Sequence, residues 1–315
     1  MTRARALVAL AAVAAALAVA GCGGSGGTGD SRPRLPAIDQ GGERWQALQG
    51  TLGARFDQDG QNACVRGART CVPVVVAEMR RRLDVLAGQC SHLAPFALMY
   101  LDVTAGVEQA QRRGERFRDL PYLAHLDAVF AGFYFRAFDA WRNGRDREVP
   151  AAWRLAFEAA DRKVVSGIGD LMLGMNAHIS RDLPFALAAS GLQGTDGQSA
   201  RPDFDAVNAL LNTTAGPMID EQARRFDPSV KSFTAPVLGI SSLDLGALLW
   251  LWRTEAYRNA EKLIAAPTPA ARRRVAAAIE ADAAQRARLI QVATSYAVLG
   301  GSTAARDRFC ARRSA

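Results

Sequence analysis

The segment PYLAHLDAVFAGFYFRAFDAWRN, residues 121–143, decides the fold class. Asp127 and four aromatic residues recur along it three or four positions apart, the spacing of one face of an α-helix: Phe130, Tyr134, Phe138 and Trp141. Pro121 suits a first helical turn, and Gly144 stands where a helix C-cap glycine is expected. The segment predicts one long helix whose inward face carries a carboxylate.

Other segments have the same helical periodicity. We expect helices over 91–114, from Pro150, over 164–182, from Pro184, from Pro202 or Asp203, from Ser242 to Leu263, and from Thr268 to Tyr296. No segment shows a convincing alternation of apolar and polar residues. The run 238–252 is too short to span a bilayer and contains Asp244, so it is expected in the core. The sequence predicts an all-α fold, a single multi-helix bundle.

The N-terminal residues predict export. Arg3 and Arg5 precede an uncharged apolar stretch, residues 6–20, and the run Val-Ala-Gly-Cys follows, ending at Cys22. The stretch is too short for a membrane-spanning helix and is typical of a secretory signal, residues 1–21. Its ending resembles the lipobox that bacterial lipoprotein enzymes read before they acylate the cysteine. The alternative is an ordinary signal cut after Ala-Val-Ala. We expect Cys22 to be lipidated and to hold the chain on the outer face of the cell membrane.

Residues 22–42 follow as a Gly-, Ser- and Pro-rich tether without apolar periodicity. Such a segment is expected to be a flexible coil that spans roughly 25 Å. The remaining 43–315, about 270 residues, are enough for one large domain with a substantial core.

The composition is basic, with a formal net charge of +8. Only three of the 39 basic residues are lysines, Lys163, Lys231 and Lys262, and this bias is typical of a GC-rich genome. A basic surface attracts anionic lipid, but net charge alone does not indicate a task. No nucleic-acid partner is expected.

The cysteine count agrees with export. With Cys22 lipidated, four cysteines remain, an even number that suggests two disulfides outside the cytoplasm, with three possible connectivities. We favour Cys64 with Cys71, which closes a small loop, and Cys90 with Cys310, which pins the C-terminal tail to the domain. A metal site is the weaker alternative, because no C-x-x-C pair occurs.

Common enzyme signatures are missing. The sequence has no G-x-S-x-G, no H-E-x-x-H and no P-loop. Only three histidines occur, His92, His125 and His178, and this number limits the imidazole ligands or bases that a site can use.

The segment LGMNAHISRDLP, residues 173–184, is the most informative polar stretch. His178 and Asp182 lie four positions apart, so a continuous helix places them on one face, where they can bind one divalent metal ion, with Asn176 close by. The alternative is structural: His178 is a hydrogen-bonded core residue and Asp182 caps the helix entered at Pro184.

Asp127 extends this polar site. It lies on the inward stripe, and an unpaired buried carboxylate costs several kcal/mol, about 3–5 when a partner is removed. The possible partners are His178, a metal ion shared by Asp127, His178 and Asp182, or Arg253, in which case the pair is a plain buried ion pair. His125 is expected to be a surface residue of the first helical turn.

The segments FALMYLDVT, LDAVFAGFYFRA, PAAWRLAF, LGMNAHISRDLPFAL and DFDAVNALL together resemble a family found largely in actinobacteria and catalogued as a domain of unknown function. The resemblance covers residues 96–212, with a fainter one at 253–263. Its core is a G-x-N-A-H-I-x-x-D-L-P motif, in which members have Asn where this chain has Ser180. The polar signature residues that it implies are Thr104, Asp127, Asn176, His178, Asp182, Asp203 and Asn208, with Arg253 in the fainter part.

Three functions remain open. The first is a binding module. It holds an envelope lipid or small molecule in a pocket with a polar centre, or it binds an interaction partner. The second is a metal-dependent hydrolase of a phosphoester or lipid, in which His178 and Asp182 hold the metal that activates water. His-x-x-x-Asp before Pro is similar to the helical zinc-dependent phospholipases and nucleases, but this chain has too few histidines for their metal clusters. The third is a scaffold whose buried polar cluster fixes helix register.

Overall fold

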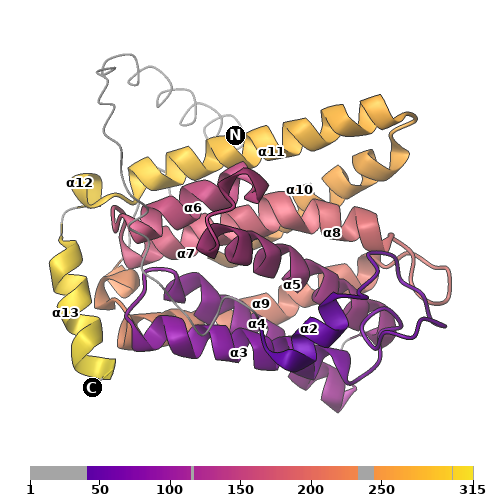
Figure 1. Ribbon diagram of the computed structural model, residues 1–315, viewed down its shortest axis with the longest axis horizontal. Helices are drawn as coiled ribbons and strands as arrows, with labels where there is room; N and C mark the ends of the chain where they lie inside the picture. Colours follow the sequence, from indigo (N-terminus) through magenta and orange to yellow (C-terminus); the bar gives the residue numbers. More distant parts are fainter. Residues whose placement is uncertain (1–40, 115–116, 233–244, 300, 315) are drawn as a thin grey trace, which may run out of the picture.

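Figure 1 shows the computed structural model of the chain, which describes residues 41–314 apart from 115–116, 233–244 and 300. The expected signal peptide, Cys22, nearly all of the tether, Ser242 and Asp244 lie outside the described residues. In the described part the fold is all-α and forms a single domain, as the sequence predicts. No strand forms there, and only isolated bridges join Val165 to Ser295 and Gln193 to Ser199.

The helices follow one another along the chain. The α-helices are α2 (Glu43–Gln49), α3 (Cys71–Gly88), α4 (Ala94–Arg113), α5 (Leu120–Arg142), α6 (Ala151–Asp161), α7 (Gly167–Met175), α8 (Leu183–Ser190), α9 (Arg201–Arg225), α10 (Leu245–Ala265), α11 (Pro269–Ala293), α12 (Tyr296–Leu299) and α13 (Thr303–Ser314). Between them lie the short 3-10 helices η2 (Asp146–Glu148) and η4 (Pro228–Ser232) and the π-helix η3 (Asn176–Asp182).

The centre of the bundle is the continuous rod formed by α7, η3 and α8 (Figure 1). The π-helical turn η3 is contacted by α5, α6, α10 and α11, and α4 packs on α7. Helices α3 and α4 pair on one side of the rod, and α10 and α11 form an antiparallel hairpin on the other. The polar residues of η3 therefore lie in the middle of the domain.

Local sequence signals explain where several helices begin. The Asp119 carboxylate accepts a 2.9 Å hydrogen bond from the Tyr122 amide and so caps α5, and Thr268 caps α11 in the same way by accepting from Ala271. Ser166 caps α7, so this helix begins at Gly167 and not at the predicted residue 164. At α4, Ser91 accepts from the Leu93 amide, and the helix begins three residues after the expected cap.

The core is rich in aromatic residues. Trp45, Tyr122, Phe135, Phe138 and Trp153 are almost completely buried. Burying a side chain of this size contributes about 1.5–3 kcal/mol each. None of the helices that the structure describes combines the length and the hydropathy that a membrane span requires.

Both predicted disulfides are confirmed. Cys64 and Cys71 are bonded with their Cα atoms 4.9 Å apart, and Cys90 and Cys310 with theirs 5.8 Å apart. The second bond joins the end of α3 to α13, so it holds the C-terminal helix against the bundle.

Candidate functional site

The candidate site is built on η3, where the central rod changes from α-helix to π-helix. Asn176, His178 and Asp182 all lie in this seven-residue turn, and all three are buried. π-helical turns are rare and occur frequently at functional sites. The sequence expectation of an ordinary α-helix is therefore wrong at this position, although His178 and Asp182 still meet on one face.

The Asp182 carboxylate organises the turn. Its Oδ2 lies 3.2 Å from His178 Nδ1 and accepts a 2.7 Å hydrogen bond from the Trp153 indole N–H. Its Oδ1 accepts from Arg181, whose guanidinium also binds Glu280. Asp182 has helical backbone angles and makes no cap hydrogen bond, so the predicted N-cap role is wrong. The carboxylate instead accepts hydrogen bonds from side chains in the core.

The imidazole of His178 lies in an aromatic box. It stacks face to face on Phe130, with ring centroids 3.6 Å apart, and meets the Tyr100 ring edge-on at 4.3 Å. Phe96, Tyr134 and Trp153 complete the box at centroid distances of 5.7, 6.2 and 6.0 Å. Burial lowers the pKa of His178, and Asp182 opposes this only in part. The neutral ring then donates from Nδ1 to Asp182 and keeps the Nε2 lone pair free to accept.

Four polar atoms on residues of this box or on their helical neighbours are buried without a hydrogen-bond partner among the described residues: His178 Nε2, Tyr100 Oη, Thr104 Oγ1 and Asp127 Oδ2. Tyr100 and Thr104 lie one turn apart on α4, and Asp127 lies one turn before Phe130 on α5. Burial and the nearby charges of Asp127 and Asp182 raise the pKa of Tyr100, so its hydroxyl keeps its proton. These four residues are named the polar cluster below.

Among the described residues Asp127 has no ionic partner to stabilise its charge. Part of the residue is exposed, but its Oδ2 is fully buried, and burial raises the pKa of Asp127 to about 7. Arg253, one predicted partner, lies elsewhere: it donates to Asn208 Oδ1 and to the Phe204 carbonyl and covers the Phe204 ring. The predicted Asp127–Arg253 ion pair is wrong.

Comparison with protein families places the site in a known family. The model of a family described as Family of unknown function (DUF5995) matches residues 72–293. The chain belongs to the DUF5995 family. No curated protein and no solved structure matches significantly. The DUF5995 region contains the whole polar cluster, whereas α13 lies outside it.

Three of the signature residues in the DUF5995 region, Asp203, Asn208 and Asn176, make structural hydrogen bonds. Asp203 accepts hydrogen bonds from the Arg118 and Asp119 amides at 2.8 and 2.7 Å and so fixes the start of α5. Asn208 orients Arg253. Asn176 donates to the Ala283 carbonyl and ties η3 to α11, and Ser180 accepts from Arg286. Among the other signature residues, His178 and Asp182 form the hydrogen-bonded pair in the box, and Thr104 and Asp127 lie one helical turn from Tyr100 and Phe130.

The predicted metal set does not form. Within the described ranges no group of three or more His, Cys, Asp and Glu side chains is arranged to hold a metal ion. The physical reason is that both carboxylate oxygens of Asp182 already accept hydrogen bonds from protein donors. His178 and Asp182 meet as a hydrogen-bonded pair, and Asp127 is not part of a shared ligand set.

Sequence reasoning missed several residues of the site. Neither Tyr100 nor Trp153 was singled out from the sequence, yet the Tyr100 hydroxyl belongs to the polar cluster and the Trp153 indole donates to Asp182. His125 was expected at the surface but is fully buried. The carbonyls of Cys64 and Ala54 contact its two ring nitrogens. Segment 51–70 covers this part of α5, and no periodicity signal reveals such a cover.

Proposed function

We propose that this DUF5995 protein is a lipid-anchored binding protein of the outer face of a bacterial cell membrane. In this proposal the polar cluster holds the hydroxyl- or amine-bearing end of a small ligand. The observation that carries the binding function is the set of four buried polar atoms without partners at His178, Tyr100, Thr104 and Asp127. Leaving such an atom unpaired costs about 1–3 kcal/mol, so a ligand that supplies hydrogen bonds gains affinity there.

The chemistry of the cluster indicates the ligand class. His178 Nε2 and Asp127 Oδ2 accept hydrogen bonds, and the Tyr100 hydroxyl both donates and accepts. Aromatic rings line the rest of the box, and they favour apolar groups and cations next to the polar end. A small amine or polyol fits this pattern, as in the head of an envelope lipid. A carboxylate does not fit, because it meets the acidic Asp127.

Ligand binding is tested with ethanolamine, glycerol and acetate as probes. Ethanolamine or glycerol is expected to raise the thermal midpoint of the full chain at pH 8, whereas acetate is not. The Asp127→Asn and Tyr100→Phe variants should lose this stabilisation. Asp84→Asn, an exposed carboxylate on α3, is the matched control and should keep it. Equal shifts in all variants, or no shift with either probe, would contradict binding at the cluster.

The location has separate support. Two disulfides agree with an oxidising compartment, and Cys22 is the one cysteine outside both bonds. We expect the full chain to fractionate with membranes and Cys22→Ser to be released into the soluble fraction, with intact mass measuring the acyl chains on the wild type. Wild-type chain that is soluble and unacylated would contradict the anchor without affecting the binding site.

A second candidate function is acid–base catalysis. The observation that favours it is the His178–Asp182 pair, in which the carboxylate fixes Nδ1 and leaves Nε2 as a base. The pKa of Asp127, about 7, also suits proton transfer near neutral pH. Turnover of an amine- or polyol-bearing ester that His178→Gln abolishes would favour this function over simple binding.

A further inference from the structure

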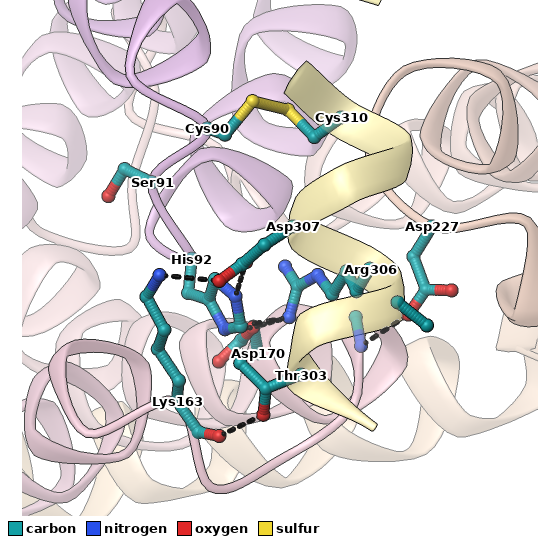
Figure 2. Close-up of polar contacts among 12 residues, drawn as sticks. Cys90, Ser91, His92, Lys163, Asp170, Asp227, Thr303, Arg306, Asp307 and Cys310 are labelled. Carbon is teal, nitrogen blue, oxygen red and sulfur yellow. Dashed lines mark hydrogen bonds and ion pairs between the residues drawn. A yellow bond between two sulfur atoms is a disulfide. The ribbon is translucent and has the colours of Figure 1, made fainter. Parts of the chain in front are cut away.

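Helix α13 is fastened to the domain at several points (Figure 2). The disulfide from Cys310 reaches Cys90 at the end of α3. One turn earlier, Asp307 binds Lys163 Nζ at 2.7 Å and His92 Nε2 at 3.0 Å. At the start of the helix, the Thr303 hydroxyl donates to the Lys163 carbonyl.

A buried charge network lies under α13. Arg306 points from the helix into the domain and donates to Asp170 Oδ2 at 2.5 Å, and it lies 2.9 Å from His92 Nδ1. Arg306, Asp170 and His92 are 6%, 5% and 3% exposed. Removing the cation from a buried carboxylate is strongly destabilising. Asp170 and His92 therefore depend on α13 to remain covered and paired.

The points that hold α13 are also points of backbone strain. In the described chain only two residues other than glycine have positive φ, Cys90 at 50° and Lys163 at 53°. A residue with a side chain is strained in this left-handed region, and such strain is frequent in switch regions. One of these residues forms the disulfide to α13, and the other forms its ion pair.

A small cavity connects this network to the aromatic box. His92 and Asp170 line one part of it, and Phe96, Tyr134 and Trp153 line another. The cavity is about 10 Å³, close to the volume one water molecule requires. The last three residues are also walls of the box around His178. Arg306 of α13 contacts His92 and Asp170, so α13 covers two of the residues that line this cavity.

We propose that α13 is a redox-controlled latch over the entrance to the polar cluster, an inference that rests on the proposed function. An external dithiol reduces the Cys90–Cys310 bond: the dithiol becomes a disulfide, and Cys90 and Cys310 each gain one electron and one proton. The bond nearer the surface is the one that reacts, because Cys90 is half-buried, whereas Cys64 and Cys71 are fully buried. Release of α13 then removes Arg306 and Asp307 from His92 and Asp170 and opens the cavity.

The three histidines allow a direct test on the full chain. His92 lies under α13, His178 in the box, and His125 in a separate buried place under segment 51–70. Diethylpyrocarbonate modification, read by peptide mass spectrometry, should find all three protected in the oxidised chain. In Cys90→Ser/Cys310→Ser, or after mild dithiol treatment, His92 and His178 should react at least ~10-fold faster, because local opening exposes them, while His125 stays protected.

Two results would overturn the latch. If His92 reacts and His178 stays protected, α13 moves but does not cover the entrance; if both stay protected, α13 remains docked without the disulfide. If the cysteine variant also exposes His125, Arg306→Gln replaces it, and the reactivities of His92 and His178 are read by the same criteria. Arg312→Ala, on the exposed face of α13, is the control for Arg306→Gln.

Different results would contradict the latch and the binding function. Ethanolamine that binds equally fast to the oxidised and the reduced chain overturns the latch and leaves the binding function. A His178 that becomes reactive on reduction, in a chain that binds neither ethanolamine nor glycerol, supports the latch and overturns the binding function.

Discussion

Replacing Asp182 with alanine is expected to lower the free energy of unfolding by about 3–5 kcal/mol. The carboxylate accepts from three donors, His178 Nδ1, Trp153 Nε1 and Arg181 Nη1, in the centre of the bundle. The variant leaves the indole and the imidazole without acceptors and removes a counter-charge of Arg181. Urea unfolding followed by circular dichroism measures the loss.

Asp220→Ala is the matched control for this change. Asp220 pairs with Lys231 at the surface, where both side chains are more than half exposed. An exposed ion pair contributes about 0–1 kcal/mol, so this variant should unfold close to the wild type. If Asp182→Ala is as stable as Asp220→Ala, the proposed role of Asp182 as the organiser of η3 is wrong.

Replacing Asp127 with asparagine should stabilise the ligand-free protein at pH 8 and have no effect near pH 4. Burial raises the pKa of Asp127 to about 7, so between pH 4 and pH 7 the folded chain binds a proton that the unfolded chain has lost. The free energy of unfolding of the wild type therefore falls as pH rises through this window. The Asp127→Asn variant does not lose stability in this way, because asparagine does not titrate. At about 1.4 kcal/mol for each pKa unit, and with some exposure of the residue, the gain at pH 8 is about 2–4 kcal/mol.

Unfolding midpoints of the wild type, Asp127→Asn and Asp84→Asn at pH 4, 5.5 and 8 measure this effect. The difference between the wild type and Asp127→Asn should grow with pH, and Asp84→Asn should follow the wild type throughout. A constant difference across the three pH values would show that Asp127 titrates normally. Ethanolamine bound to the carboxylate at pH 8 should reduce the difference.

The sequence was sufficient for the fold class and for both disulfides. The stripe from Asp127 to Trp141 is a strong helical signal because its inward face is almost entirely aromatic. The start of α3 was not predicted, because Cys-Val-Pro-Val-Val-Val combines a proline with β-branched residues, and both have low helix propensity. Here tertiary packing outweighs the local preference, because Val72, Val75 and Val76 are buried in the core.

The candidate site was predicted only in part. The pairing of His178 with Asp182 follows from their spacing, but the π-helical turn does not, because a period of 3.6 residues does not reveal a local widening. The partners of Asp182 come from α6 and from within η3, and the residues that join His178 in the polar cluster come from α4 and α5. Contacts between distant segments depend on packing angles that one sequence does not specify.

The bond between Cys90 and Cys310 closes a covalent ring, since its cysteines are 220 positions apart. A protease that cuts the backbone once within this ring separates no fragment from the molecule. The nicked protein should migrate as one band on a denaturing gel without reductant and as two with it. Most of the DUF5995 region, including η3, lies inside the ring, so proteolysis at one position leaves the halves of the domain attached to each other.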